Sequence, residues 1–313
     1  MIVLAIEETL KKGLQEPGQV VPMIPTFVFG WPTGDEKGEY LALDLGGTNL
    51  RVCLVTLMGA GKFEVTQTKY RLTEEQKHED GQNLQLHQNY FGADRSRWQA
   101  AAWIYSHYRT DLSSVLVPLL LRIDHGELIR WTKGFGAPNI EGRDNVPVDL
   151  VAIVNDTTGT LIASNYVDSN TKIAVIFGTG CNAAYMETAE NIPKMGSIGL
   201  PSDQGMAINC EWGAFDSFEY LHLPRTKYDI IIDEVSNKPG EQACTLSCTA
   251  FEKLIAGLYL GEIFRLVLCE LVDSGDLFLG QAADKLEKAY AFDTAYLSLM
   301  ESDPTEELLT IIG

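Results

Sequence analysis

Two glycine-rich turns of the same design, far apart in the chain, constrain the fold most. Each turn joins two apolar, strand-like segments, the first hairpin spanning residues 40–57 and the second residues 172–186. A single such turn is compatible with an ordinary hairpin, because Gly-Gly and Gly-x-Gly are common turn sequences. Here both turns carry Thr and Asn beside their glycines. The repetition favours a pair of phosphate-binding loops, one in each of two related lobes.

The segments around these hairpins predict a mixed α/β chain. Residues 2–14 have helical spacing, prolines at 22, 25 and 32 predict an irregular extended arm, and residues 148–154 form an apolar run typical of a buried strand. Helical periodicity over residues 251–271 predicts a helix, with further helices expected over 278–300. We expect an N-terminal helix and arm over residues 1–30, a small lobe over 31–150 and a large lobe over 151–313. Within the small lobe, residues 82–121 have no clean period and are atypical.

Composition excludes several classes of partner. The 313 residues carry a net charge of -19, which disfavours binding to nucleic acid or to an anionic membrane surface. The longest apolar run, residues 115–121, is too short to cross a bilayer, and the first residues lack the basic region of a secretory signal. Six scattered cysteines are typical of reduced thiols, so we expect a cytoplasmic protein. Cys244 and Cys248 have no second pair of ligands beside them, and no metal site is predicted.

Asp44 stands at the end of the first hairpin's leading strand, directly before the Gly-Gly turn. Glycines let successive N–H groups point into one concavity that can hold phosphate oxygens. A carboxylate at that place can hold Mg²⁺ through water, because Mg²⁺ keeps most of its water ligands. No G-x-x-x-x-G-K-[ST] sequence occurs, so the chain is not a P-loop protein.

A second candidate follows the apolar run at residues 148–154. Asn155 and Asp156 come at the end of this expected strand, where the sites of open α/β sheets usually lie. Asp156 has two possible roles: it could be a helix cap, or it could take the proton from an attacking hydroxyl in phosphoryl transfer. Thr157 or Thr158 could also cap the following helix. The residues alone leave these alternatives open.

Five motifs occur in the chain in the order found in eukaryotic hexokinases, and the chain resembles that family. Residues 31–38 resemble the fungal members. The similarity covers residues 21–81 and 122–313. The motifs are Leu43-Asp44-Leu45-Gly46-Gly47-Thr48-Asn49-Leu50-Arg51-Val52, Trp131-Thr132-Lys133-Gly134-Phe135, Asn155-Asp156-Thr157-Thr158-Gly159-Thr160, Gly178-Thr179-Gly180-Cys181-Asn182 and Asn209-Cys210-Glu211-Trp212-Gly213-Ala214-Phe215-Asp216.

The resemblance implies an actin-like ATPase (ribonuclease H-like) fold with two lobes around a cleft. It further implies an enzyme of glycolysis that uses ATP and Mg²⁺ to phosphorylate a hexose at its 6-hydroxyl, with Asp156 as general base. Taken singly, the polar candidates for the sugar site are more typical of surface or turn positions. The resemblance assigns to the sugar Thr132, Lys133, Asn155, Asn182, Glu211 and Glu252. It assigns to the nucleotide Asp44, Gly46, Gly47, Thr48, Asn49, Arg51, Gly178, Thr179 and Gly180.

The chain also departs from the family pattern. Residues 117–121 replace a family segment whose serine binds the sugar, a family helix is missing between Asp144 and Val146, and residues 243–250 are inserted. The sequence stops before the segment that completes the family's large lobe and holds adenosine, so we expect that lobe to be incomplete at its C-terminus. Altered splicing or a faulty gene model would produce such breaks. We expect weak or lost activity, because adenosine contacts and their orienting effect would be missing.

Two other functions remain open at this stage. One is a non-catalytic hexokinase-like protein that binds sugar and regulates or senses; the other is an actin-like ATPase of the chaperone or filament type. The residues do not distinguish glucose, fructose and mannose, and they do not determine the oligomeric state.

Overall fold

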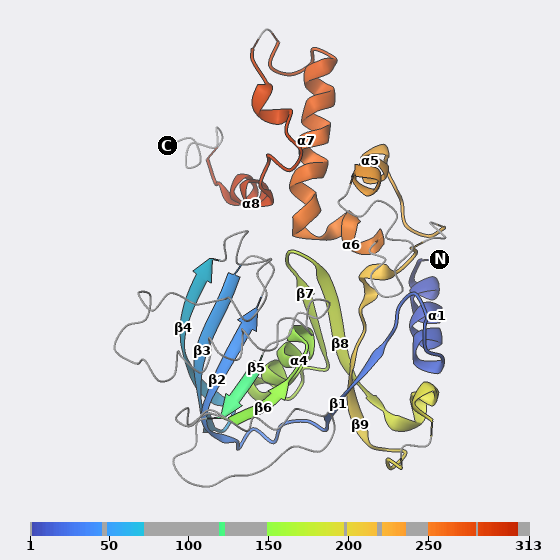
Figure 1. Ribbon diagram of the computed structural model, residues 1–313, viewed down its shortest axis with the longest axis vertical. Coiled ribbons are helices and arrows are strands. Elements are labelled where there is room, and N and C mark those ends of the chain that lie inside the picture. Colours follow the sequence, from blue (N-terminus) through green and yellow to red (C-terminus); the bar gives the residue numbers. More distant parts are fainter. Residues whose placement is uncertain are drawn as a thin grey trace, which may run out of the picture.

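The computed structural model describes residues 2–45, 49–71, 119–122, 149–196, 199–217, 221–235, 250–279 and 281–305. The described chain forms two β-sheets with helix α4 between them, and a group of helices at one end (Figure 1). None of the helices formed by these residues combines the length and the apolar composition that a membrane span requires.

The first sheet has five strands in the order β4-β3-β2-β5-β6, and every neighbouring pair is antiparallel. Its predicted hairpin is confirmed as β2 and β3. A four-residue strand also forms at the end of the atypical segment and extends one residue past it, where sequence periodicity gave no signal. The strands are β2 (Lys37–Leu45), β3 (Asn49–Gly59), β4 (Lys62–Arg71), β5 (Leu119–Arg122) and β6 (Asp149–Ile153).

The pairing register places two candidate residues at the same edge of this sheet. Leu43 of β2 pairs with Leu119 of β5, which pairs with Ile153 of β6. β2 and β6 therefore run in the same direction, about 10 Å apart at the usual strand spacing. The end of β2, with Asp44, and the end of β6, which leads to Asp156, consequently lie at one edge.

The second sheet has four strands in the order β1-β9-β8-β7, again all antiparallel. Its hairpin β7–β8 is the second one expected from the sequence. The prediction of an irregular arm is wrong in part, because the segment contains β1, which includes Pro25 and pairs with β9. Proline is tolerated there because β1 is an edge strand. The strands are β1 (Ile24–Phe29), β7 (Ile173–Phe177), β8 (Cys181–Thr188) and β9 (Gly205–Asn209).

Helix α4 (Asp156–Val167) follows β6 and joins the two sheets. Leu161 is fully buried against Ala174, Ala184 and Ala207 of the second sheet. At the other end of the helix, the Tyr166 hydroxyl donates toward the carbonyls of Glu36 and Lys62 and accepts from the Gly59 N–H, all around the first sheet. The helix that begins at Asp156 is thus anchored on both sheets.

Helix α1 (Ile2–Gln15), predicted from its spacing, packs its apolar face on the second sheet. The Lys194 ammonium group holds its C-terminal end in place by donating to the carbonyls of Gly13 at 2.6 Å, Pro22 at 2.5 Å and Met23 at 2.5 Å. Carbonyls at a helix C-terminus lack intrahelical donors and favour a cation. Lys194, which follows β8 in the chain, therefore attaches the helix and the arm to the second sheet.

The C-terminal helices only partly match the expectation. The helix predicted over 251–271 is two helices with a break at Ala256, whereas residues 278–300 contain one short 3-10 turn and α8. The buried Glu262–Arg265 pair explains the irregular part: Arg265 donates to the Leu286 carbonyl and Glu262 accepts from the Tyr290 N–H. The α-helices are α5 (Lys227–Val235), α6 (Ala250–Ile255), α7 (Gly257–Asp273) and α8 (Thr294–Ser302). The 3-10 helices are η2 (Ala189–Asn191), η3 (Pro193–Met195), η4 (Trp212–Ala214) and η6 (Asp284–Leu286).

Candidate active site

Asn155 and Asp156 lie where β6 passes into α4. Asn155 has extended backbone angles and its side-chain oxygen accepts from the N–H groups of Thr157 at 2.9 Å and Thr158 at 3.3 Å, so Asn155 is the helix cap. The capping roles considered for Asp156, Thr157 and Thr158 are therefore wrong. Asp156 is the first helical residue, and one of its oxygens accepts from the Thr157 N–H at 2.7 Å. Its anionic carboxylate sits at the helix N-terminus, where the helix dipole stabilises negative charge.

Glu211 follows β9 in an unusual backbone conformation. Its φ of 53° lies in the left-handed region, which is uncommon for a residue with a side chain. Its N–H donates to the side-chain oxygen of Asn182 at 2.9 Å. One carboxylate oxygen, Oε1, accepts from the amides of Asn209 at 2.8 Å and Asn182 at 3.0 Å. The strand ends of β8 and β9 therefore hold this acid in one orientation.

Glu252 reaches the same place from helix α6. Its Oε2 accepts from the Cys181 N–H at 3.0 Å, directly after the second glycine turn. A Cβ on Gly180 would lie 2.6 Å from that oxygen, and one on Gly213 would lie 3.2 Å from the Glu252 Cβ. Glycine at both positions lets the carboxylate approach the turn closely.

The electrostatics of these acids are coupled. Burial raises the pKa of Glu211, and the nearby charge of Asp156 raises it further, against the lowering effect of the two asparagine amides. Burial also raises the pKa of Glu252, with Glu211 adding to the effect. Such an arrangement disfavours the charged forms until a ligand supplies hydrogen-bond donors. Shifted carboxylates of this kind cluster at functional sites.

The second glycine turn is tied to the start of helix α7. Within the turn, the Gly178 N–H donates to the Gly180 carbonyl at 2.9 Å; its own carbonyl accepts from Gly257 at 2.8 Å, and that of Thr179 accepts from Leu258 at 3.3 Å. The carbonyls of Gly178 and Thr179 therefore face α7. Within the described ranges, the N–H groups of Thr179 and Gly180 have no hydrogen-bond partner, so the turn can offer them to an anion.

The first glycine turn is only partly described. Asp44 pairs with Arg51 across β2 and β3, Asn49 begins β3, and Arg51 is exposed. Other predicted positions lie outside the described residues: Gly46, Gly47, Thr48, Thr132 and Lys133. The structure thus brings together Asp156, Asn182, Glu211 and Glu252, while the nucleotide residues of the small lobe remain predictions.

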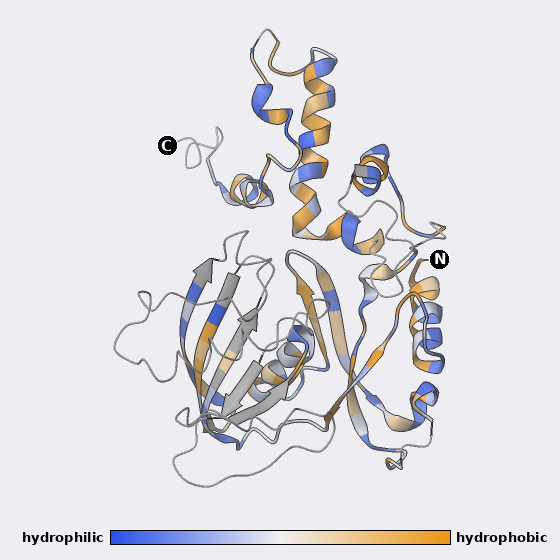
Figure 2. Cartoon of the chain, viewed as in Figure 1, coloured by the Kyte–Doolittle hydropathy of each residue, from blue (hydrophilic) through white to orange (hydrophobic). Residues whose placement is uncertain are grey.

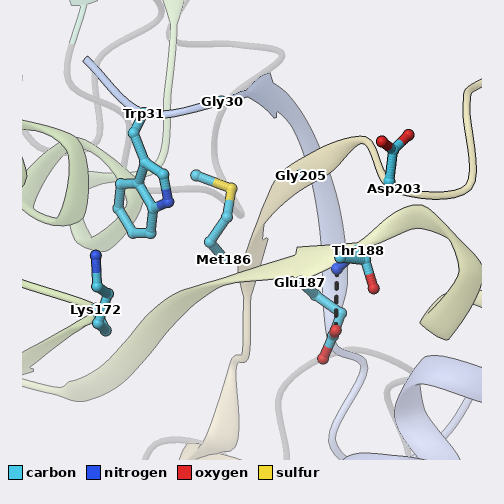
Figure 3. Close-up of a pocket in the computed structure, with 8 residues that line it drawn as sticks. All are labelled: Gly30, Trp31, Lys172, Met186, Glu187, Thr188, Asp203 and Gly205. Carbon is cyan, nitrogen blue, oxygen red and sulfur yellow. Dashed lines mark hydrogen bonds between the residues drawn. The ribbon is translucent and has the colours of Figure 1, made fainter. Parts of the chain in front are cut away.

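A cavity of about 460 Å³ lies elsewhere, near the opposite end of β8 (Figure 3). Trp31, Met186 and Lys172 line it, with the Lys172 ammonium 5.1 Å from the centre of the Trp31 ring. None of the predicted site residues contributes to it. The carboxylate cluster, rather than this cavity, contains the groups suited to chemistry.

Sequence reasoning gave no role to Asn209, which the structure places inside the cluster. A signal was available: Asn209 stands two residues before Glu211, and alternate residues of a strand point to the same side. Because the strand ends between them, only the structure shows that both side chains still meet.

Comparisons with known proteins agree with this architecture. Two protein-family models, both described as hexokinase, match residues 1–88 with 120–166 and residues 172–312. Hexokinase of Kluyveromyces lactis is 44% identical over 96% of this chain, and hexokinase-2 of Saccharomyces cerevisiae is 43% identical over 96%. The chain spans 63% of the length of each of these relatives.

A solved structure gives the same result for the fold. Hexokinase from Schistosoma mansoni complexed with glucose superposes with a TM-score of 0.67 at 29% identity, covering 98% of this chain and 71% of that one. The two sheets are those of the actin-like ATPase fold expected from the sequence. With both family models matching in order along most of its length, the chain belongs to the hexokinase family.

Proposed function

We propose that this protein transfers the terminal phosphoryl group of ATP to the 6-hydroxyl of a hexose, in the cytosol, as the first step of glycolysis. The observation that carries the proposal is the meeting of Asp156, Asn182, Glu211 and Glu252, which come from α4, β8, the end of β9 and α6. A site rich in oriented acids and amides suits a ligand with many hydroxyls. The glucose complex of the S. mansoni relative supports a hexose as that ligand.

Asp156 is the proposed general base. It would accept the proton of the 6-hydroxyl as the sugar oxygen attacks the phosphorus and the bond to the departing ADP breaks. Asn182, Glu211 and Glu252 would bind the remaining hydroxyls. In this proposal Asn155, Thr132 and Lys133 complete the sugar site.

The phosphates of ATP would lie between the two glycine turns. The N–H groups of Thr179 and Gly180 are candidates on the large-lobe side, in a turn whose Gly178 and Thr179 carbonyls accept from α7. The small-lobe candidates are Gly46, Gly47, Thr48, Asn49 and Arg51. Mg²⁺ would arrive bound to the ATP phosphates and offset their charge, and Asp44 is its candidate contact through water.

We further propose that turnover is lower than in the curated relatives. The family model leaves residues 89–119 unmatched, inside the segment that departs from the family pattern. The sugar-binding cluster is built from regions that do match. A sugar-binding cluster in matched regions, beside an unmatched segment, also favours a second candidate function. This candidate is a sugar-binding protein with regulatory rather than catalytic function.

An assay of glucose phosphorylation, coupled to a reporter of product, should be run beside a calorimetric titration with glucose. Hexose-dependent turnover that disappears in Asp156→Asn would support the kinase. Binding without turnover would replace it by the second candidate, and ATP hydrolysis indifferent to hexose would indicate the chaperone or filament type of ATPase. Absence of both binding and turnover would refute the sugar-site assignment.

A further inference from the structure

Asn209 is the most buried polar side chain of the carboxylate cluster. It is 4% exposed, whereas Asn182 and Glu211 are only partly buried. Its amide nitrogen donates to Glu211 Oε1 at 2.8 Å, and its amide oxygen accepts from the Asn182 nitrogen at 2.7 Å. A group so enclosed has little surface to offer a ligand, so any influence on one must pass through its two neighbours.

These bonds treat the two oxygens of Glu211 differently. Oε1 receives both asparagine amides, whereas Oε2 has no hydrogen-bond partner within the described ranges. The Asn182 side-chain oxygen also holds the Glu211 N–H, which fixes the left-handed backbone at this residue. The triangle of Asn182, Asn209 and Glu211 therefore restricts the acid to one rotamer and leaves one oxygen to meet a hydroxyl.

We propose that Asn209 is a positioning residue for hexose binding, which orients Glu211 and Asn182 without touching the sugar. This inference rests on the proposed function and deepens it. A hydrogen bond from a neutral amide to a buried carboxylate contributes more than one between neutral groups. Pre-orientation also reduces the entropy lost on binding.

The charged surroundings of Glu211 give the proposal a signature in pH. The titratable groups that face it are Asp156 from α4, Glu252 from α6, and the thiols of Cys181 on β8 and of Cys210 directly after β9. Burial raises the pKa of Glu211, and the Asn209 amide opposes that rise. Oε1 already accepts from two amides, so a proton taken up by the carboxylate would occupy Oε2, the oxygen left to accept from a hydroxyl. Glucose affinity should therefore fall as pH falls through the raised pKa. Without the Asn209 amide, this fall should occur at higher pH.

Asn209→Ala and the isosteric Asn209→Asp should be compared with the unaltered chain by calorimetric titration with glucose across the acidic and neutral range. We expect each to weaken glucose binding about tenfold near neutral pH, the loss of one hydrogen bond to a charged group. The fall in glucose affinity on acidification should move to higher pH in both variants. The shift should be larger in Asn209→Asp, because the new carboxylate places a like charge beside Glu211. The KM for ATP should change less than that for glucose.

The matched control is Asn165→Ala. Asn165 is equally buried at 4% exposure, but its amide binds the carbonyls of Ser169 and Thr171 at the far end of α4. It should lower the thermal midpoint without moving the pH profile of glucose binding. If Asn165→Ala and Asn209→Ala gave the same pH profile of glucose binding, the effect of Asn209 would be structural and the proposal would fail.

A second measurement does not require sugar. In ligand-free protein with ¹³C-labelled glutamate, NMR titration of the Glu211 carboxyl should show a higher pKa in both Asn209 variants than in the unaltered chain. An unchanged pKa would overturn the inference. If the unaltered chain failed to bind glucose, the proposed function would be refuted, while this titration would still decide whether Asn209 holds Glu211.

Discussion

The two sheets start from the same unit and end in different surroundings. In each, a glycine-turn hairpin is followed by a third antiparallel strand beside the second, giving β4-β3-β2 in one sheet and β9-β8-β7 in the other. The leading strand β2 has a further partner, β5, on its other side. The leading strand β7 has no such partner among the described strands, and it exposes Ile173 at 63%, Val175 at 40% and Phe177 at 64%.

The turn that follows β7, rather than the edge of the strand, is bound by helices. The β7–β8 turn is bound by the first N–H groups of α7, and the Cys181 N–H at the start of β8 donates to Glu252 of α6. Figure 2 shows β7 as hydrophobic along its length, in contrast to the nearly white turn that follows it. The same local motif thus lies in different tertiary surroundings in the two sheets. The last strand of the first sheet leads to the candidate base, whereas strands of the second sheet carry residues of the candidate sugar site.

The division between base and sugar site predicts the largest effect. Asp156→Asn should reduce kcat by about 10²–10⁴-fold, the usual contribution of a general base, while glucose binding changes little. Coupled kinetics and calorimetry together measure the two quantities. Asp168→Asn, at the exposed far end of the same helix, is the control and should leave both unchanged. If Asp156→Asn lost glucose binding and turnover in parallel, the assignment of the base to one sheet and of sugar binding to the other would be wrong.

Attachment of the arm to the second sheet should have the next largest effect. Lys194→Met keeps the aliphatic stem but removes the donors to three carbonyls, so we expect the free energy of unfolding to fall by about 2–3 kcal/mol. Urea unfolding measures this loss. Lys11→Met, whose partner Glu7 is also exposed, should cost much less than Lys194→Met, because exposed ion pairs contribute little. Equal costs would mean that Lys194 contributes no more than a surface ion pair.

The hydrogen bonds between the β7–β8 turn and helix α7 should affect the KM for ATP. A Cβ on Gly257 would lie 2.9 Å from the Gly178 carbonyl, so Gly257→Ala should displace the turn. We expect the KM for ATP to rise about tenfold, equivalent to roughly 1.4 kcal/mol, with glucose affinity retained. Gly205→Ala in β9 is the control, because its Cβ would meet Met186 at an ordinary 3.4 Å. An unchanged KM for ATP would mean that the β7–β8 turn does not bind the phosphates.

The smallest effect tests the exposed edge directly. Val175→Thr on β7 should change stability by less than about 0.5 kcal/mol, because the side chain is 40% exposed. Val52→Thr on β3, where the side chain is 3% exposed, should cost about 1–3 kcal/mol for burying a hydroxyl. Thermal unfolding of the pair compares the sheets at matched chemistry. Equal costs would show that β7 is covered in solution.

The sequence predicted elements wherever a pattern was local. Both hairpins, α1 and the placement of Asp156 after a strand follow from alternation, helical spacing and glycine turns, which act within a few residues. The pairing of β1 with β9 was missed because it joins Ile24 to Asn209, and no local pattern records such a partner. The helices expected over 278–300 are present only in part, as a 3-10 turn and α8, because the Glu262–Arg265 pair binds the backbone of Leu286 and Tyr290 from outside that segment.

For the site, the sequence by itself determined the inventory of chemical groups: two glycine turns, an acid after an apolar strand, and the acids and amides of the family motifs. Only the tertiary structure decided that Asn155 caps α4, that Glu211 adopts a left-handed backbone, and that Asn209 holds its Oε1. The physical reason is that a residue's type is encoded where it stands. Its orientation and its pKa depend on burial and on partners, and those partners come from strands and helices distant in the chain.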